Sequence, residues 1–476
     1  MVIPFGWVET LTNDRCLLWS IPHGATAGNV LRTGVLASVL AAVPDVRVVL
    51  LSPLAADPPF VREFAHPRVS FEVLPPHAPA GFEGRLLGVI QASFLAVCKT
   101  DTLRIRGSRE FPGAKRWRRL KRLLGRVLAP RGGSGDWYGR ADRLVRDAAM
   151  ERLFDRYRPS LVATASPGLI FSEIPVLRAA RRAGVRTMAV DLSWDNLTNK
   201  FLPPRQVDRL VLWNGTMRDE AHSLHGYDLD RIAVTGPPQF DSYFTGPRSS
   251  RADFCRPLGL DPARRLITLA TIPSGKFPHH PFVIDRLIEA IESGGLCQPA
   301  DLLVRLHPRD DIRHYESYRG RPHVVVEKAF RSTAARSGDG MDVDFMSENT
   351  RHLADTLFHS DVVLNVASTL AIEASIFDTP VVNIGFDGQP GSNRSLMEWH
   401  YGSTHFQKVV RSGAVRIAQS SGEMVDLINL YLGDPAQDAA GRRRIVAEQC
   451  EFTDGRSAER LAGEIVGQLM RSTEVN

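Results

Sequence analysis

The sequence VVLNVASTLAIEASIFDTPVVNIGF occupies residues 362–386 and contains three segments with different hydrophobic patterns. Residues 362–366 form an apolar, β-branched run that is typical of a buried strand. Residues 369–377 favour a helix, and residues 380–384 form a second apolar run after a proline. Strand, helix and strand at this spacing predict a βαβ unit with parallel strands. This stretch therefore predicts an α/β fold.

The same alternation extends through most of the chain. In the second half we expect strands at 265–270, 301–306 and 324–326, with helices at 281–293 and 351–359. In the first half we expect strands at 15–21, 46–51, 69–74, 161–165, 186–191, 209–213 and 232–235. Helices are expected at 30–42, after a small-residue loop at 23–28, and from Ser166-Pro167 onward. Two successive α/β units are the simplest interpretation.

The length of 476 residues exceeds what one hydrophobic core can organise. Gly236-Pro237-Pro238 ends an expected strand, and the chain is polar from 245 to 251. We therefore predict a first Rossmann-like domain at 1–245, with a basic helical insert at about 85–157, and a second at 252–476. The last helix, at about 456–471, either closes the second domain or packs back on the first.

Composition restricts the class of protein. Hydrophobic residues make up 43% and charged residues 24%, as in soluble globular proteins, and no apolar run approaches the roughly 20 residues of a membrane span. We expect no secretory signal, since no basic segment precedes an apolar one at the start. The five cysteines are scattered without CxxC spacing, which favours neither disulfides nor a zinc site. These features predict a cytoplasmic protein.

The net charge of +6 is concentrated in residues 104–131, where eleven Lys or Arg face one acid, a net of +10 that leaves about −4 elsewhere. Within this segment Trp117, Leu120, Leu124 and Leu128 recur at helical spacing among the cations, as in an interfacial amphipathic helix. A solvated basic face over an ordinary core contact is the alternative. A nucleic-acid partner would require a wider footprint. We expect a local anionic partner, such as a membrane surface bound through Lys115–Arg126, and no nucleic acid.

Ser368 and Thr369 form a hydroxyl pair where the strand at 362–366 gives way to a helix. Free N–H groups and the helix dipole at such a position favour a phosphate. The alternative is that either residue is only a helix N-cap. Glu373, one turn further on among apolar neighbours, could reach sugar hydroxyls beyond the phosphate.

Two further loops follow expected strands of the second domain. His307 and Arg309, in LHPR at 306–309, come at the carboxyl end of a strand, where ligands bind α/β sheets. A satisfied loop histidine is the alternative. Lys276 ends TIPSGK at 271–276 and could neutralise a leaving diphosphate; a Walker loop is absent, so ATP hydrolysis is not supported.

The segments DLLVRLHP (301–308) and 362–386 resemble motifs of the GT-B superfamily of glycosyltransferases. Within it they are similar to bacterial sialyl- and Kdo-type capsule transferases and to CDP-glycerol glycerophosphotransferases. The resemblance implies two Rossmann-like domains facing each other across a cleft. It also implies that His307, Ser368 and Thr369 bind the phosphates of a nucleotide-activated donor and that Glu373 binds its ribose.

One position departs from the largest retaining GT-B family, whose members have two glutamates separated by seven residues. Counting back from Glu373, the first of these positions is Asn365. Membership of that retaining family is therefore not supported. The departure leaves inversion unproven.

In this fold the acceptor binds the first domain, where a base must deprotonate its hydroxyl. His23, after the first strand, is one candidate, with support of a tight turn as the alternative. Asp191 and Asp195 in VDLSWDNLTNK are the others. Trp194 and Asn196 in the same loop suit an acceptor sugar, through stacking and hydrogen bonds, although Trp194 could instead fill the core.

The leading hypothesis is a cytoplasmic glycosyltransferase that moves a sugar from a nucleotide donor to a glycan or glycolipid hydroxyl in bacterial surface-polysaccharide synthesis. Peripheral attachment to the inner membrane face is part of this hypothesis. No cofactor and no metal site are expected. The DxD strings at 228–230 and 342–344 fall in an expected turn and loop. Alternatives are CDP-glycerol-type phosphoalcohol transfer, nucleotide-sugar 2-epimerisation and a non-catalytic scaffold of a polysaccharide-synthesis complex.

Overall fold

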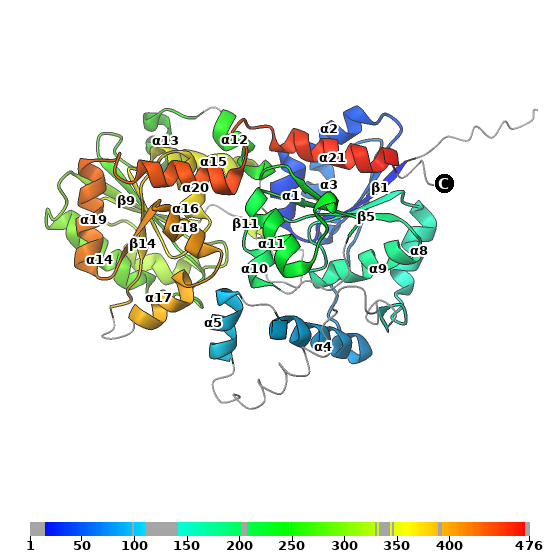
Figure 1. Ribbon diagram of the computed structural model, residues 1–476. Helices are drawn as coiled ribbons and strands as arrows, with labels where there is room; N and C mark the ends of the chain where they lie inside the picture. The colour runs from blue at the N-terminus through cyan, green and yellow to red at the C-terminus, as the bar shows by residue number, and fades with distance from the viewer. Residues whose placement is uncertain are drawn as a thin grey trace, which may run out of the picture.

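The computed structural model describes residues 15–97, 100–110, 141–200, 207–246, 248–328, 331–332, 343–344, 347–388 and 393–471. Within them the chain forms two parallel sheets that stand side by side (Figure 1). Among these residues no single helix has the length and apolar composition of a membrane span. One pair of helices, Gly24–Thr33 and Val35–Ala42, meets both criteria together but is bent by 49°.

The first sheet has the strand order β3-β2-β1-β4-β5-β6-β7 among the described residues, and all neighbours are parallel. Its strands are β1 (Cys16–Ser20), β2 (Arg47–Leu51), β3 (Val69–Glu72), β4 (Leu161–Thr164), β5 (Arg186–Val190), β6 (Arg209–Leu212) and β7 (Ile232–Val234). Every residue of β1 and β4 is buried, since a parallel sheet is covered on both faces.

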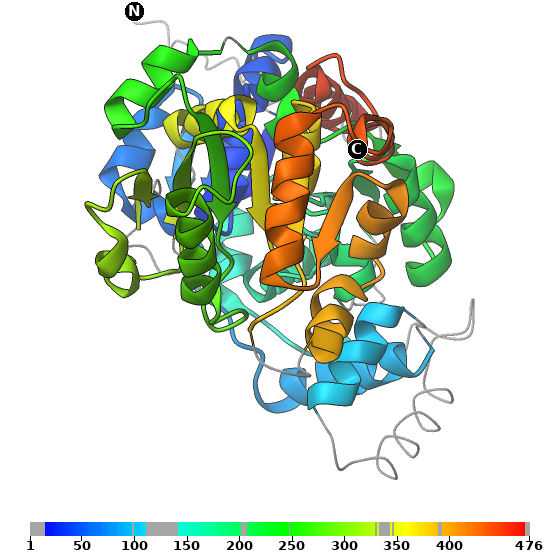
Figure 2. The same ribbon diagram turned by 90° about the vertical axis from the view of Figure 1, so that its left-hand side faces the viewer.

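The second sheet has the order β10-β9-β8-β13-β14-β15 and is also parallel (Figure 2). Its strands are β8 (Arg265–Ala270), β9 (Ala300–Arg305), β10 (Val324–Glu327), β13 (Val362–Asn365), β14 (Val381–Ile384) and β15 (Val415–Ala418). A short antiparallel pair, β11 (Arg331–Ser332) and β12 (Val343–Asp344), accompanies it, and β12 lies against α1 of the first domain. The predicted α/β fold with two Rossmann-like units is confirmed.

Helices connect the strands in both units. Those of the first are α1 (Gly24–Val30), α2 (Val35–Ala42), α3 (Pro58–Glu63), α4 (Gly81–Val97), α5 (Asp101–Glu110), α8 (Ala148–Tyr157), α9 (Ile174–Arg182), α10 (Asn196–Asn199) and α11 (Gly215–His225). Those after β7 are α12 (Asp241–Thr245), α13 (Arg251–Leu258), α14 (His280–Glu292), α15 (Ser347–His359), α16 (Leu370–Ile376), α17 (Asn393–Tyr401), α18 (Phe406–Ser412), α19 (Ser421–Gly433), α20 (Ala439–Cys450) and α21 (Ser457–Arg471).

The last helix, α21, packs on the first sheet although α20 before it covers the second. Leu461 and Ile465 are fully buried in a cluster that also contains Leu17 of β1 and Val39 of α2. Figure 1 shows α21 lying beside α2. Of the two positions considered for this helix, the chain therefore uses the one on the first domain.

Two predicted helices of the first domain are corrected. Residues 23–28 are not a loop, because the His23 side chain accepts from Thr26 N and caps α1, and Gly34, with φ 88°, separates α1 from α2. The helix expected from Ser166 begins only at Ile174. The Ser166 hydroxyl instead accepts from Leu169 N and Ile170 N and donates to Glu173, which holds a turn.

The basic insert is helical at α4, α5 and α8, where it is described. Figure 1 shows α4 and α5 at the lower edge of the molecule. Lys115–Arg126, the segment expected to meet a membrane, lies outside the described residues.

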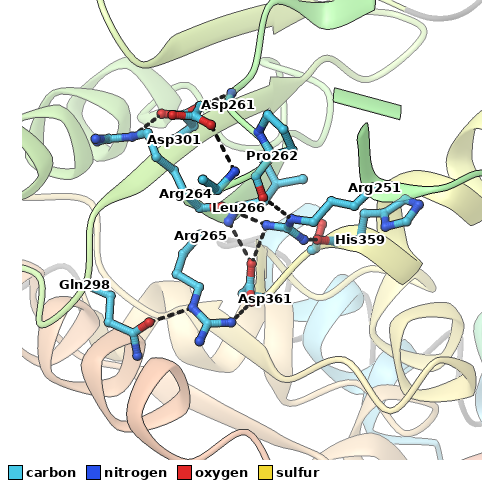
Figure 3. A network of polar contacts seen from close by, with 12 residues as sticks. Arg251, Asp261, Pro262, Arg264, Arg265, Leu266, Gln298, Asp301, His359 and Asp361 are labelled. Carbon is cyan, nitrogen blue, oxygen red and sulfur yellow. Dashed lines mark hydrogen bonds and ion pairs between the residues drawn. The ribbon is translucent and has the colours of Figure 1, made fainter. Parts of the chain in front are cut away.

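Charged side chains join the amino ends of three strands of the second sheet (Figure 3). Asp361, just before β13, accepts from Arg265 Nη1 at 2.8 Å, from Arg251 Nη2 at 2.9 Å and from the Leu266 amide at 2.8 Å. Asp301 of β9 accepts from Arg264 Nε at 2.6 Å. Through Arg251, the first residue of α13, these contacts fix that helix to the amino end of the sheet.

Candidate functional site

Each sheet reverses its strand order once near the centre. In the first sheet the reversal lies between β1 and β4, and in the second between β8 and β13. Crossover connections leave such neighbouring strands in opposite directions, which opens a crevice at their carboxyl ends where α/β proteins bind ligands. The loops after β8 and β13 contain Lys276 and the pair Ser368–Thr369. Three residues predicted from sequence thus lie on the loops beside the second reversal point.

The loop after β9 is tied to the loop after β8. The His307 amide donates to Thr271 Oγ1 at 2.8 Å, and that hydroxyl donates to Asp310 at 2.7 Å. Asp310 also accepts from the Ser274 amide and hydroxyl, at 2.9 and 2.6 Å. These bonds hold the two loops at fixed positions next to each other.

The imidazole of His307 is suited to donate a hydrogen bond. Burial lowers its pKa to about 4, with Asp310 opposing this and the charges of Arg309 and Lys276 adding to it. The neutral ring accepts from the Arg309 amide at Nδ1, at 3.1 Å, so its proton resides on Nε2. The structure therefore brings Lys276, His307 and Arg309 together as one positively polarised group, in which Lys276 and Arg309 are exposed.

The hydroxyl pair after β13 sits beside a strained residue. Ala367 has φ 39°, in the left-handed region that a side chain disfavours. Ser368 Oγ accepts from the Leu370 amide at 3.3 Å, as in a local capping turn. Thr369 occupies the N-cap position of α16 but makes no side-chain capping bond. Its hydroxyl accepts instead from Trp194 Nε1 of the first domain, at 3.3 Å, so the simple capping interpretation does not apply to Thr369.

Glu373 of α16 contacts the helix α12, which follows the last strand of the first sheet. Its Oε2 accepts from Tyr243 Oη of α12 at 2.9 Å. Burial raises the pKa of Glu373 to about 7, while the Tyr243 bond and the charge of Arg305 oppose this rise. The ribose-binding role of Glu373 stays a prediction, and a ribose hydroxyl there would compete with Tyr243.

The loop after β5 carries the predicted first-domain residues. Asp191 is fully buried and accepts from Asn196 Nδ2 at 2.5 Å and from the Ser193 amide at 3.2 Å. Burial raises the pKa of Asp191 to about 7 against these hydrogen bonds. Among the described residues, its second oxygen, Oδ2, has no hydrogen-bond partner. A buried carboxyl that titrates near neutrality is a candidate proton acceptor.

Trp194 and Asn196 differ from the expectation of an open acceptor surface. Trp194 is 3% exposed, with its ring against His405 at 5.2 Å and Phe406 at 6.3 Å between centroids. Asn196 is 6% exposed. In this structure Trp194 fills the core, which was the alternative to sugar stacking, because second-domain side chains pack against the indole ring.

Asp195 faces the second domain from the same loop. Burial would raise its pKa, but the neighbouring His405 and the hydrogen bond from Ser193 outweigh burial and lower it. Asn199 Nδ2 also donates to Asp195, at 3.1 Å. Its oxygens already accept these bonds and its pKa is lowered. Asp195 is therefore poorly suited to take up a proton.

His23 lies at the end of β1 in the crevice of the first sheet. Its Nδ1 accepts from the Thr26 amide at 3.2 Å, which leaves the proton of the neutral ring on Nε2. Burial and the charge of Lys200 lower the pKa of His23 to about 4. This tautomer makes Nε2 a donor, so the predicted base role of His23 is not favoured by the geometry.

Sequence reasoning missed two groups. His405 pairs electrostatically with Asp195 from the far side of the junction, and nothing in its neighbourhood at 400–406 indicates this. Glu173 is fully buried between β1 and β4 and accepts from the Ala165 amide and Ser166 Oγ, both at 2.7 Å. Burial raises its pKa to about 7. A lone acid in the apolar run around 170–177 was the available signal for Glu173.

A metal centre is not assembled in the described part of the chain, where no group of three or more His, Cys, Asp or Glu side chains has a suitable arrangement. Asp228 precedes a short 3₁₀ turn (Leu229–Arg231), and Asp230 lies within it. Of the second DxD string, Asp342 lies outside the described residues.

Comparison with known proteins gives structural relatives only. No protein-family model and no curated protein matches the sequence. A Listeria monocytogenes protein described as a UDP-N-acetylglucosamine 2-epimerase superposes with TM-score 0.56 and 11% identity, over 96% of this chain and 97% of that one. Staphylococcus aureus MnaA, solved with UDP, gives 0.53 and 10%, over 95% and 96%. A variant of the wall teichoic acid polymerase TagF gives 0.50 and 10%, over 97% and 90%.

These likenesses extend over nearly the whole chain, so they include both sheets and the junction between them. At such low identity they establish architecture and not activity. The resemblance inferred from residues 301–308 and 362–386 is thereby confirmed at the level of fold. The chain has the GT-B fold, with two Rossmann-like domains whose strand carboxyl ends meet at a common junction.

Proposed function

We propose that this chain is a GT-B glycosyltransferase that transfers a sugar from a nucleotide-activated donor to a hydroxyl of a glycan or lipid-linked acceptor. The observation that carries the proposal is the contact between Trp194 and Thr369. It brings the first-domain loop with the titratable Asp191 against the second-domain loop that begins α16. A donor and an acceptor bound at these two loops would meet.

The donor diphosphate binds beside Ser368 and Thr369 in this proposal. Lys276 and Arg309 supply positive charge, and His307 Nε2 supplies a hydrogen bond from a neutral ring. Such preorganised donors stabilise the charge that develops on a leaving diphosphate without moving during the reaction. The amide groups at the start of α16 add to them. No resident metal or cofactor is part of the proposed chemistry.

Asp191 is the proposed base. Its pKa of about 7 matches the pH at which a general base must gain and lose a proton, and its free Oδ2 can accept one. Asn196 orients the carboxyl through Oδ1. Because Asp191 is fully buried, binding of the acceptor beside it requires the loop after β5 to rearrange.

The place of action is proposed from the relatives. MnaA was solved with UDP, and TagF is described as a wall teichoic acid polymerase. This supports a nucleotide-linked donor and a role in cell-surface polysaccharide synthesis. Lys115–Arg126 remains a proposed site of peripheral attachment.

The test begins with a thermal-shift screen of UDP, CDP, GDP, CMP, their sugar conjugates and CDP-glycerol, since a ligand of the native state raises the midpoint. The nucleotide that binds is then tested against His307→Ala, with His314→Ala as the control because His314 is exposed in the same domain. We expect only His307→Ala to weaken binding. Equal affinities would remove His307 from the donor site.

Three outcomes distinguish the alternative functions that this fold allows. Conversion of the donor sugar without any acceptor would identify an epimerase. Transfer from CDP-glycerol would identify a phosphoalcohol transferase. No stabilisation by any nucleotide would favour a non-catalytic scaffold.

A further inference from the structure

The helix α5 of the insert contacts both domains. Its first turn is capped by Thr100, whose hydroxyl accepts from the Leu103 amide at 3.3 Å and donates to the Thr198 carbonyl at 2.9 Å. Thr198 belongs to α10, in the loop after β5 that also carries Asp191. On its other side α5 lies against α17 of the second domain, and Figure 1 shows it between α17 and α4 at the foot of the junction. The start of α5 therefore connects the loop after β5 to the second domain.

Two threonines form a reciprocal pair across the junction. The Thr404 amide donates to Thr102 Oγ1 at 2.9 Å, and the Thr102 amide donates to Thr404 Oγ1 at 3.3 Å. Thr102 is 5% exposed, and Ile105, almost one turn further along, is 4% exposed. Ile105 lies over Gly402, where an added Cβ would come within 3.0 Å of Ile105 Cδ1. We call residues 100–105, which make all of these contacts, the strap.

The contacts of the strap are strong enough to hold it and weak enough to break. A neutral hydrogen bond favours the attached position by roughly fivefold, so the bond from Thr100 and the two bonds of the Thr102–Thr404 pair together favour it by roughly 10²-fold. Burial of Ile105 adds to this preference. Because polar groups of a detached strap would bond to water instead, detachment is rare at rest but accessible.

The segments that the strap joins contain buried polar atoms without hydrogen-bond partners among the described residues. Two of these atoms, Asp191 Oδ2 and Asn196 Oδ1, belong to the loop after β5, and the third, Nδ1 of His405, is next to Thr404. An unpaired buried polar atom costs free energy. A ligand whose hydroxyl groups bonded to these atoms would remove that cost and would offset the lost contacts of the strap.

We propose that the strap closes the loop after β5 in the ligand-free protein and detaches to admit a hydroxyl-rich ligand to Asp191 and Asn196. A helix that only joined the domains would not need to cover a loop with unpaired carboxylate and amide oxygens. That the ligand is the sugar acceptor rests on the proposed function. The strap and its movement do not rest on it.

A disulfide between Thr102→Cys and Thr404→Cys tests the movement. Each Oγ1 already lies close to the main chain of the other residue, so two sulfur atoms at these positions can meet. Cys98→Ser and Cys297→Ser remove competing thiols, and the remaining cysteines are buried. We expect hydrogen exchange at residues 191–199 to be roughly 10²-fold slower in the oxidised than in the reduced protein, because exchange there needs the strap to detach.

The variant with Thr102→Cys alone, in the same background and with the same oxidant, is the control and should show no difference. Equal exchange at residues 191–199 in the linked and reduced proteins would overturn the proposal.

A pair of loosening substitutions gives the opposite effect and does not depend on forming the disulfide. Thr102→Val with Thr404→Val keeps the volume of both side chains and removes two hydrogen bonds, so exchange at residues 191–199 should be roughly 25-fold faster. Exchange in β8 and β13 should not change. Thr33→Val, which removes a bond to Val30 O within the first domain, is the matched control. An unchanged rate at residues 191–199, or an equal increase in both sheets, would contradict the strap.

An activity measurement separates the strap from the proposed transfer. The oxidised double-cysteine protein should bind the nucleotide found in the thermal-shift screen with unchanged affinity. Its transfer to a crude membrane extract should fall by roughly 10²-fold and recover on reduction. Full transfer by the linked protein would overturn the strap as the entrance for the acceptor. Slower exchange in the linked protein without binding of any nucleotide would support the strap and contradict the transferase.

Discussion

Trp194 Nε1 donates to Thr369 Oγ1 across the junction of the two domains, at 3.3 Å and over 175 residues of sequence. The indole is buried, so losing this bond leaves a polar group without its partner. The bond couples the loop after β5 to the start of α16. The contribution of this hydrogen bond to the free energy of unfolding should therefore be measurable.

A double-mutant cycle of Trp194→Phe and Thr369→Val tests this coupling. Each substitution removes one partner and keeps most of the volume, and we expect an interaction energy of about 1 kcal/mol. The measurement is urea unfolding of the wild type, both single variants and the double variant. Additive effects would mean that the contact contributes nothing to stability.

Lys276→Ala should weaken binding of a nucleoside diphosphate by roughly 10- to 100-fold, because a hydrogen bond to a charged group contributes about 1.5–3 kcal/mol. Isothermal titration with the nucleotide found in the screen measures this loss. The matching nucleoside, which lacks phosphate, should bind both proteins alike. Arg411→Ala, an exposed cation on α18, is the protein control. A loss that is equal for nucleoside and diphosphate would place Lys276 away from the phosphates.

Asp191→Asn should abolish a rise in kcat/KM through a pH of about 7, since the carboxyl must be ionised to accept a proton. Activity at high pH should fall by roughly 10²- to 10⁴-fold. The folded pKa of about 7 lies above the ordinary value of 3.8, so the folded state binds the extra proton in this window. Stability from Asp191 therefore decreases as pH rises from about 4 to about 7.

Thermal unfolding across that pH window checks the same residue without a substrate. Asp191→Asn should reduce the decrease in stability that accompanies rising pH, because the amide cannot ionise. Asp311→Asn, at a partly exposed side chain paired with Arg313, is the control. An unchanged pH dependence of both activity and stability would contradict the raised pKa.

Asp361→Ala should destabilise the second domain by roughly 2–4 kcal/mol, because Arg251, Arg265 and the Leu266 amide all lose an acceptor. These contacts (Figure 3) lie at the amino ends of the strands, whereas the loops proposed to bind the donor follow the carboxyl ends. Nucleotide affinity of the folded variant should therefore be retained. Differential scanning calorimetry and titration measure the two effects, and a loss of affinity without a loss of stability would reverse this interpretation.

Leu461→Ala should destabilise the first domain by about 2–5 kcal/mol, since it leaves a cavity where the fully buried side chain of α21 meets the first sheet. Hydrogen exchange should increase in β1 and α2 more than in β8 or β13. Met470→Ala, at an exposed position of the same helix, should have little effect. Faster exchange confined to the second sheet would contradict the packing of α21.

The alternation of strands and helices could be predicted because it depends on local patterns. Residues 362–386 contain an apolar run, a helix start and a second apolar run, and each forms β13, α16 or β14. The start of α9 could not be predicted, because the Ser166 hydroxyl donates to Glu173 rather than starting a helix. A proline after a serine is equally compatible with both structures.

The sequence by itself determined the α/β class and the placement of Lys276, His307 and Thr369 on loops after strands, because periodicity and turn residues act within a few positions. Only the tertiary structure decided that Trp194 is buried, that His405 faces Asp195 and that α21 returns to the first domain. It also decided that Asp191 titrates near neutrality. Burial and pairing depend on residues far apart in the chain, and these contacts exist only when both sheets have formed.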